Sequence, residues 1–267
     1  MIIERLDGKQ YDILDYGLAR LYHNIPSAEI KHTTATLDGL GEINISSTID
    51  QRTITVDFFY QVKDIYDYYL LRDELNALFL SNEPFYIIFK REPYKKWLVK
   101  ISEGYQIPPS RKGNGFTLKF RTVQKFAESI GDTTSIKEWD SGIWGWNDTI
   151  NWDEDLKYDF TTSNFSVYNL GTAYLKPEEW KLEIIVTGVS NGEFKLVNWT
   201  TGDEYIYRGA IRSGDVLKIG VSSYKNGVSV FKDTNYKLIS LAPGENKFSV
   251  HGMSSQNIKF NFKFPYM

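Results

Sequence analysis

The sequence predicts a mostly β protein with two domains: an N-terminal β-rich domain with one α-helix, followed by a C-terminal β-sandwich. The chain has 267 residues, a length that fits two ordinary domains better than one. Aromatic residues make up 15% of it, and aromatic side chains favour strands. From residue 165 onward, short strand-like runs alternate with turn signals. Regular short strands of this kind are typical of a sandwich.

The stretch from Arg52 to Ser102 organises the N-terminal half as strand, helix, strand, strand. Residues 52–60 alternate between the two faces and are rich in β-branched side chains, which predicts a half-buried strand. Asp64, with Asp67 three residues later, predicts the start of a helix, and Pro84 predicts its end. The apolar runs 85–89 and 97–101 predict the next two strands.

The predicted helix is apolar on more than one face. One face carries Ile65, Tyr68, Leu71, Leu75 and Leu78. Tyr66, Tyr69 and Leu70 spread beyond that face, so the helix needs cover on two sides. Two interpretations stay open: the helix is wedged inside the core of its own domain, or a neighbouring subunit covers its second face.

Turn signals predict further strand ends in both halves. Residues 11–14 indicate a short early strand, and residues 116–123 alternate clearly enough to close the first domain. Asn-Gly pairs favour the tight turns of hairpins. We therefore expect hairpin tips at residues 111–115, at Asn191-Gly192 and at Asn226-Gly227.

Charge is unevenly distributed along a chain whose net charge is −3. Residues 90–125 hold ten Lys or Arg against two Glu, and residues 132–160 hold eight Asp or Glu against two Lys. The two stretches are either separate solvated surfaces or surfaces that meet, within one chain or between neighbours. The overall negative charge argues against a dedicated nucleic-acid binder.

The change of composition after residue 127 predicts the domain organisation. We expect an N-terminal domain over residues 1–130, an acidic Trp-rich linker over 131–150 and a C-terminal sandwich over 151–267. The tryptophans of the linker region either stack on sugars or pack at a domain junction. Trp144, Trp146 and Trp199 are the candidate contacts for a sugar or a partner.

The residue inventory contains no catalytic set. There is no Cys, the three His are scattered, and no Gly-x-Ser-x-Gly motif is present. We therefore expect no enzymatic activity, no metal and no cofactor. No apolar run approaches the length that spans a bilayer, and the first residues have no signal-peptide pattern, so we expect no membrane association and synthesis in a cytoplasm.

Several local patterns, in order, resemble one family. The N-terminal half contributes Asp7-Gly8 with Tyr11, Ile25-Pro26-Ser27, Asp38-Gly39-Leu40-Gly41, residues 52–58, residues 68–75, residues 83–88 and residues 96–100. The C-terminal half adds Thr200-Thr201-Gly202-Asp203, residues 241–246 and the ending 258–264. The chain thereby resembles the distal tail (Dit) proteins of long-tailed phages that infect Gram-positive bacteria.

The resemblance implies a structural role in the virion, at the tip of the phage tail. Dit proteins form a hexameric ring through an N-terminal belt domain. Their C-terminal domain is a galectin-like or carbohydrate-module-like sandwich. The ring connects the tail tube protein to the tail-associated hub or lysin protein and anchors receptor-binding proteins. Genomic DNA only passes through its central channel.

Two sets of residues are expected at contacts of such a ring. Tyr66, Tyr69 and Leu70 are predicted at or beside the contact between subunits. Some residues of a basic set are predicted to contact acidic residues of a neighbouring component. The set consists of Lys90, Arg91, Lys95, Lys96, Arg111 and Lys112. The alternative function is a carbohydrate-binding protein that attaches to host cell-wall glycan through its C-terminal sandwich.

Overall fold

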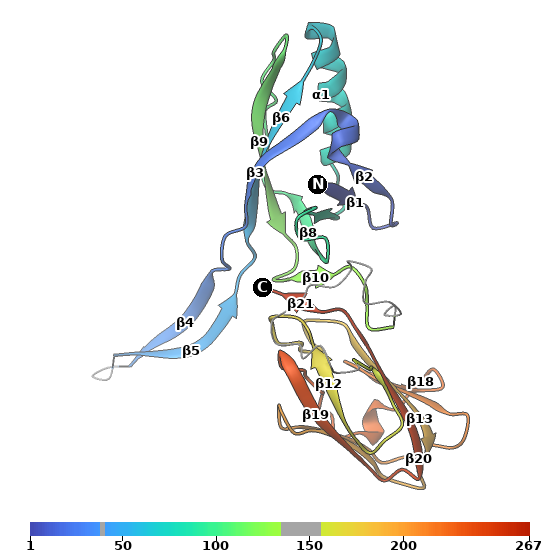
Figure 1. The fold of residues 1–267 in the computed structure, drawn as a ribbon. Helices are drawn as coiled ribbons and strands as arrows, with labels where there is room; N and C mark the ends of the chain where they lie inside the picture. Colours follow the sequence, from blue (N-terminus) through green and yellow to red (C-terminus); the bar gives the residue numbers. More distant parts are fainter. Residues whose placement is uncertain (38–40, 135–155) are drawn as a thin grey trace. The chain divides into compact units, whose positions relative to one another are not determined.

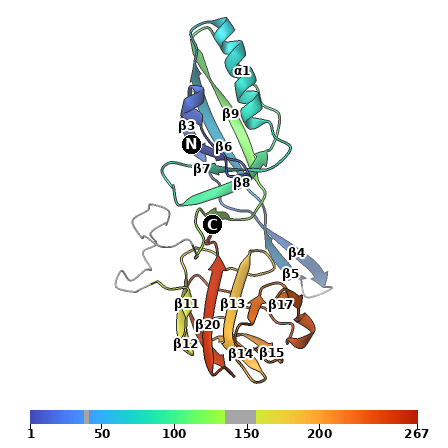
Figure 2. The ribbon, with the colours of Figure 1, turned by 90° about the vertical axis from the view of Figure 1, so that its right-hand side faces the viewer.

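The computed structural model describes residues 1–37, 41–134 and 156–267. They form two compact units: unit 1 comprises residues 1–127 with Met267, and unit 2 comprises residues 128–266. Figures 1 and 2 draw both units, which are described separately here. Both consist mainly of antiparallel β-sheet, so the predicted fold class is confirmed. Trp144 and Trp146 lie outside the described residues, as does most of the expected linker.

Unit 1 is built on a sheet with the strand order β2-β1-β7-β8-β9-β6-β3. Its strands are β1 (Ile2–Glu4), β2 (Gln10–Asp12), β3 (Leu18–Asn24), β6 (Thr53–Gln61), β7 (Phe85–Ile88), β8 (Lys95–Ile101) and β9 (Gly113–Thr122). The longest pairing joins β6 to β9, from Thr53 opposite Arg121 to Gln61 opposite Gly113. Alternate residues of β6 are fully buried, as the sequence pattern predicts for a strand with one face on the core.

The helix α1 (Ile65–Phe79) begins where the sequence predicts. The Asp64 side chain accepts hydrogen bonds from the backbone N–H groups of Tyr66 and Asp67, at 2.8 and 2.9 Å. Asp67 in turn accepts from the backbone N–H of Lys63 at 2.9 Å. This reciprocal cap satisfies backbone donors that the first helical turn leaves unpaired. The helix ends at Phe79, several residues before Pro84, so the prediction that Pro84 ends the helix is wrong.

The buried side of α1 packs on an aromatic face of the sheet. Tyr68, Leu75, Leu78 and Phe79 are the buried residues of the helix. The Phe79 ring lies 5.7 Å from that of Phe58 and 6.1 Å from that of Phe120. The Tyr68 hydroxyl donates to the carbonyl of Ile107 at 2.8 Å. One face of α1 is therefore held firmly, and Figures 1 and 2 show the helix lying along the sheet.

Two strands of unit 1 leave the main sheet as an arm. β4 (Ile30–Leu37) and β5 (Gly41–Ile49) form their own two-stranded antiparallel sheet, from Ile30 opposite Ile49 to Leu37 opposite Gly41. Figure 1 shows this ribbon extending away from the rest of unit 1. Residues 41–48 are all exposed. A two-stranded hairpin is marginally stable by itself in water, so the arm lacks the cover that such a sheet needs.

Three local predictions are wrong. The early strand stops at Asp12, and a 3₁₀ helix η1 (Ile13–Tyr16) follows, capped by Asp12. Gly113, Asn114 and Gly115 are part of β9 and pair with β6, so no hairpin tip lies there. Asn191-Gly192 connects strands of two different sheets and forms no hairpin tip either.

Unit 2 is a sandwich of two sheets. One sheet has the order β11-β20-β13-β16-β17-β18 and the other the order β12-β19-β14-β15. The first contains β11 (Asp159–Phe160), β13 (Leu182–Val189), β16 (Val216–Ile219), β17 (Ser223–Lys225), β18 (Val228–Ser229) and β20 (Ser255–Phe262). The second contains β12 (Asn164–Asn169), β14 (Phe194–Asn198), β15 (Asp203–Tyr207) and β19 (Gly244–His251). A short 3₁₀ helix, η2 (Phe231–Asp233), and the pair of β10 (Ala127–Ser129) with β21 (Pro265–Tyr266) complete the fold.

Aromatic rings join the two sheets of unit 2. Phe260 of the first sheet lies 5.1 Å from Phe248 and 6.0 Å from Phe165 of the second, between ring centroids. Aromatic pairs at such distances add to the gain from burying their surface. The Asn226-Gly227 tip joins β17 to β18 as predicted, and both residues have positive φ, 51° and 81°. Such angles are what the tight hairpin turn requires.

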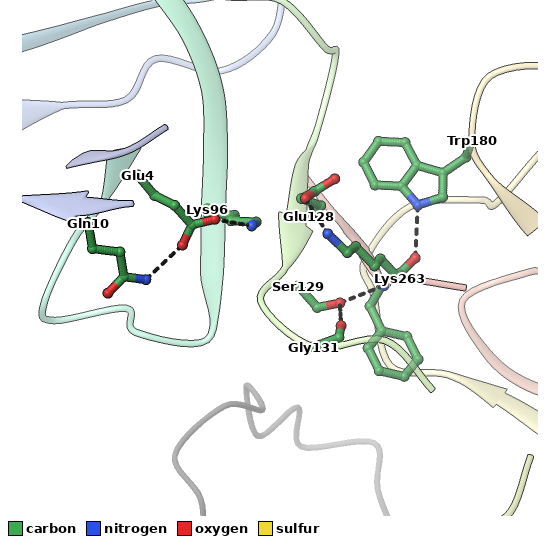
Figure 3. A network of polar contacts seen from close by, with 9 residues as sticks. Glu4, Gln10, Lys96, Glu128, Ser129, Gly131, Trp180 and Lys263 are labelled. Atoms are coloured by element: carbon green, nitrogen blue, oxygen red, sulfur yellow. Dashed lines mark hydrogen bonds and ion pairs between the residues drawn. The ribbon is translucent and has the colours of Figure 1, made fainter. Parts of the chain in front are cut away.

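Polar networks fix the starts and ends of strands in each unit. In unit 1, Lys96 pairs with Glu4 at 2.6 Å, and Gln10 donates to the same carboxylate at 2.7 Å (Figure 3). In unit 2, Lys263 pairs with Glu128 at 2.6 Å, and Trp180 Nε1 donates to the Lys263 carbonyl at 2.8 Å (Figure 3). Each of these ion pairs joins residues that are far apart in the sequence, within one unit.

Candidate assembly surfaces

The outward side of α1 carries a stripe of exposed residues. We define the outer stripe as Tyr66, Tyr69, Leu70, Asp73 and Glu74. The exposed fractions are 76% for Tyr66, 47% for Tyr69 and 67% for Leu70. Their spacing places them on one side of the helix, over about two turns. The stripe therefore combines large apolar side chains with two carboxylates.

The core of unit 1 does not cover the outer stripe. Exposed large apolar side chains that lie next to one another are a common mark of protein–protein contact. If both faces of the helix were buried within its own domain, these side chains would not be exposed. The interpretation in which a neighbouring subunit covers the second face agrees with their exposure. That Tyr66, Tyr69 and Leu70 lie at a subunit contact stays a prediction.

The six basic residues singled out in the sequence differ in their surroundings. Lys90 pairs with Asp12, and Lys95 pairs with Glu92 at 2.7 Å. Lys96 is only 7% exposed, and its partner Glu4 holds it inside the unit. Arg91, Arg111 and Lys112 are exposed, and their side chains form no ion pair with the described residues. Of the six residues, these three therefore stay available to an acidic partner.

Beside Arg91 lies a small group of rings and cations. The His23 ring stacks on Phe89 with 4.1 Å between centroids, and the Arg20 guanidinium lies 5.6 Å from the same ring. Arg20 Nη1 also contacts His23 Nδ1. Burial, and then the charge of Arg20, lowers the pKa of His23 below its ordinary value of 6.5. His23 therefore favours the neutral form in the folded protein.

This lowered pKa predicts a pH dependence of stability. Between the folded pKa and 6.5 the unfolded chain binds more protons at His23 than the folded chain does. Above pH 6.5, His23 is neutral in both states and does not reduce the free energy of unfolding. As the pH falls from 6.5 to the folded pKa, protonation of His23 in the unfolded chain lowers that free energy. We expect His23→Gln to reduce the loss of unfolding free energy between pH 7.5 and pH 5.5, measured by urea denaturation. His32→Gln, an exposed histidine of the arm, is the control; an equal pH slope in all three proteins contradicts the assignment.

Among the described residues of unit 2, Trp199 is an exposed tryptophan beside its second sheet. Trp199 is 67% exposed, and its Nε1–H donates to Ser249 Oγ at 2.9 Å. Ser249 Oγ lies 3.0 Å from His251 Nε2, so the indole is held by a chain of polar contacts. Lys247, whose backbone carbonyl accepts from the Trp199 backbone N–H, lies 3.8 Å from Glu245, and Lys195 of the same sheet pairs with Glu204 at 2.7 Å.

The part of the chain that the structure describes contains no group of three or more His, Cys, Asp or Glu suited to hold a metal. Within the same residues, no helix is long and apolar enough to span a bilayer.

The N-terminal half matches a known family. Residues 6–122 match the family described as phage tail protein RIFT-related domain. No curated protein sequence matches the chain at a significant level.

One solved structure shares the fold over nearly the whole chain. The crystal structure of the Dit protein (gp 19.1) of phage SPP1, described as a paradigm of the hub adsorption apparatus in phages that infect Gram-positive bacteria, has a TM-score of 0.65. The two sequences are 17% identical, and the match covers 98% of each chain. The phage p2 baseplate in its activated conformation with Sr gives a TM-score of 0.45 at 12% identity, over 100% of this chain and 98% of the other. A score this low adds no argument.

The resemblance to distal tail proteins is thereby confirmed at two levels. One is a domain family in the first half of the chain, and the other is the fold of nearly the whole chain. Residues 6–122 match the phage tail protein RIFT-related domain, and the chain as a whole shares its fold with the distal tail protein of phage SPP1.

Proposed function

We propose that the chain is a structural component of the phage tail tip that works as a homo-hexameric ring. Unit 1 supplies the ring and its central channel, through which genomic DNA passes. The ring connects the tail tube protein to the hub protein, and unit 2 anchors receptor-binding proteins. The tail-domain family over residues 6–122 and the Dit fold of the whole chain support this function. The proposed role is one of assembly and not of catalysis.

One observation carries the ring proposal: unit 1 has two different surfaces that lack cover. One is the outer stripe of α1, and the other is the arm formed by β4 and β5. A cyclic ring requires a heterologous contact, in which each subunit offers one patch to the next subunit and a different patch to the previous one. A domain with two unlike exposed patches fits that requirement.

Arg91, Arg111 and Lys112 are proposed to meet acidic residues of a neighbouring tail component. Salt screens exposed charges that are farther apart than about 8–10 Å, so such a contact weakens as ionic strength rises. Sequence alone leaves the neighbour open, and the tube protein and the hub protein are the two candidates.

Locating the chain in assembled particles tests the proposed function. Antibodies against unit 2, applied to intact phage particles and viewed by negative-stain microscopy, are expected to label the end of the tail and no other part. Antibodies against the major capsid protein provide the control for access. Particles that lack the chain, or labelling spread along the tail, contradict the proposal.

A second candidate function is attachment to cell-wall glycan through unit 2. The observation that favours it is the exposed Trp199 indole, whose orientation Ser249 and His251 fix. The negatively charged face of an aromatic ring attracts the polarised C–H groups on one face of a sugar. Since the charges around Trp199 are paired, a neutral polysaccharide is the better match.

The glycan candidate predicts the effect of removing Trp199. Trp199→Ala is expected to weaken binding of the full chain to purified neutral wall polysaccharide at least tenfold, because the stacking surface is gone. Tyr174→Ala, which removes another exposed aromatic ring of unit 2 (57% exposed), is expected to leave binding unchanged. Isothermal titration calorimetry measures both. Absence of binding by the unmodified chain removes this second function.

A further inference from the structure

A pocket at the base of the arm is lined by a buried arginine, Arg52. Its volume is about 540 Å³, and Ile25, Pro26, Ile30, Ile49, Arg52 and Trp97 are among its lining residues. Ile30 and Ile49 face each other at the base of the arm, where β4 begins and β5 ends. We call this pocket the socket. Its lining is mostly apolar, and its volume is within the range of ordinary ligand sites.

Arg52 lines the socket without a carboxylate partner among the described residues. Arg52 is buried, with 7% of the residue exposed. Nη1 and Nη2 reach only the carbonyl oxygens of Pro26 and Lys125, each at 3.4 Å, and Nε has no hydrogen-bond acceptor. Burial lowers the pKa of Arg52 below its ordinary value. A desolvated guanidinium is unfavourable unless an opposite charge or a full set of hydrogen-bond acceptors compensates it.

The residues around Arg52 compensate it only in part. The guanidinium lies 5.0 Å from the centre of the Trp97 ring, a favourable cation–π contact. Glu92 also lines the socket, but it is already paired with Lys95 at 2.7 Å. The Trp97 indole N–H is buried and has no acceptor. The socket therefore offers donors and a positive charge within an apolar lining.

The outer stripe of α1 has the opposite chemistry. Leu70 and Glu74 are one helical turn apart on the exposed side, and the Glu74 side chain makes no hydrogen bond or ion pair with the described residues. The neighbouring Asp73 is held only by Arg72, at 2.8 Å on the surface, which is a weak pair. An apolar side chain next to an unpaired carboxylate complements an apolar pocket with an uncompensated guanidinium.

We propose that the socket receives the outer stripe of a second copy of this chain, with Glu74 of that copy pairing with Arg52 and Leu70 filling the apolar part. This contact rests on the proposed ring. It joins the outer stripe of one copy to the socket at the base of the arm of the next copy. Figures 1 and 2 show α1 and the base of the arm at different ends of unit 1, so one copy can use both patches at the same time. The contact is head-to-tail, and its repetition closes a ring when the rotation between neighbouring copies divides a full turn.

Cross-linking tests this pairing cleanly because the chain contains no Cys. Ser27 is exposed and lines the socket, and Leu70 is exposed on the outer stripe. Mild oxidation of the double variant Ser27→Cys with Leu70→Cys is expected to give a ladder of covalent multimers up to the size of the ring on a denaturing gel. Each single variant is expected to give no ladder, because a head-to-tail contact never brings two identical positions together.

A second pair of variants tests the charge at the contact. Glu74→Gln is expected to raise the dissociation constant of the assembly at least tenfold, and Glu83→Gln, which removes an exposed carboxylate beyond the helix, is expected to leave it unchanged. Sedimentation velocity measures both. A ring that forms while the double cysteine variant stays unlinked overturns the socket and leaves the proposed function standing. A chain that stays monomeric at every concentration removes the proposed ring and this contact with it.

Discussion

Leu70→Glu is expected to convert the assembled ring into single subunits while the chain stays folded. Leu70 is 67% exposed in the single chain, so a charge there disturbs no core contact. In the assembly the same side chain is expected to be buried, where an unpaired carboxylate costs several kcal/mol. Residues at the centre of an interface that cost about 2 kcal/mol or more dominate its affinity. We therefore expect the dissociation constant to rise by a factor of about 100 or more.

Sedimentation velocity and thermal unfolding together decide this prediction. The melting temperature of the variant is expected to stay close to that of the parent chain, since exposed substitutions change stability by about 0.5 kcal/mol or less. Leu6→Glu is the matched control: Leu6 is 53% exposed in unit 1 and lies outside the outer stripe. Rings of full size from Leu70→Glu contradict a role for the stripe, and so does equal dissociation of both variants.

Phe79→Ala is expected to lower the unfolding free energy of unit 1 by about 3–5 kcal/mol. Phe79 is fully buried, and its ring packs against Phe58 and Phe120 of the sheet. Alanine removes those contacts and leaves a cavity that a β-sheet cannot easily close. Because Phe79 anchors the end of α1, the variant is also expected to weaken assembly by displacing the helix that carries the outer stripe.

Urea denaturation of the full chain measures the effect of Phe79→Ala. Leu80→Ala is the control, since Leu80 is the next residue along the chain and is 58% exposed. We expect a change of less than about 1 kcal/mol for Leu80→Ala, as for other surface positions. Equal destabilisation by both variants contradicts the packing described for α1.

Features set by local interactions could be predicted from the sequence. The start of α1 depends on the Asp64 and Asp67 caps, which need only neighbouring backbone groups. The Asn226-Gly227 tip was predictable for the same reason, because both residues tolerate the positive φ of a tight turn. The apolar residues on more than one face of the helix also predicted an apolar surface that its own domain does not bury. The exposed side chains of Tyr66 and Leu70 agree with that prediction.

Features that depend on distant partners could not be predicted in this way. Gly113 is of a residue type that is common in turns, but it lies in β9. A Cβ atom at this position would approach the Tyr60 carbonyl oxygen to 2.4 Å. At this position glycine allows two strands to approach closely, and the sequence motif alone does not distinguish this role from a turn. Residues 42–46 alternate like a half-buried strand, but among the described residues β4 is the one strand that pairs with them. Arg52 looked like the first residue of a strand, and its missing counter-charge is visible only in three dimensions.

The mass of the purified full chain in solution tests the central claim most directly. A fixed-size ring of six copies predicts a single assembled species of about six times the 30.9 kDa chain mass, formed without any added ligand. Native mass spectrometry gives the number of copies, and negative-stain images of the same sample are expected to show a ring with an open centre. A chain that remains at 30.9 kDa at all concentrations, or that forms open-ended assemblies without a preferred size, contradicts the account.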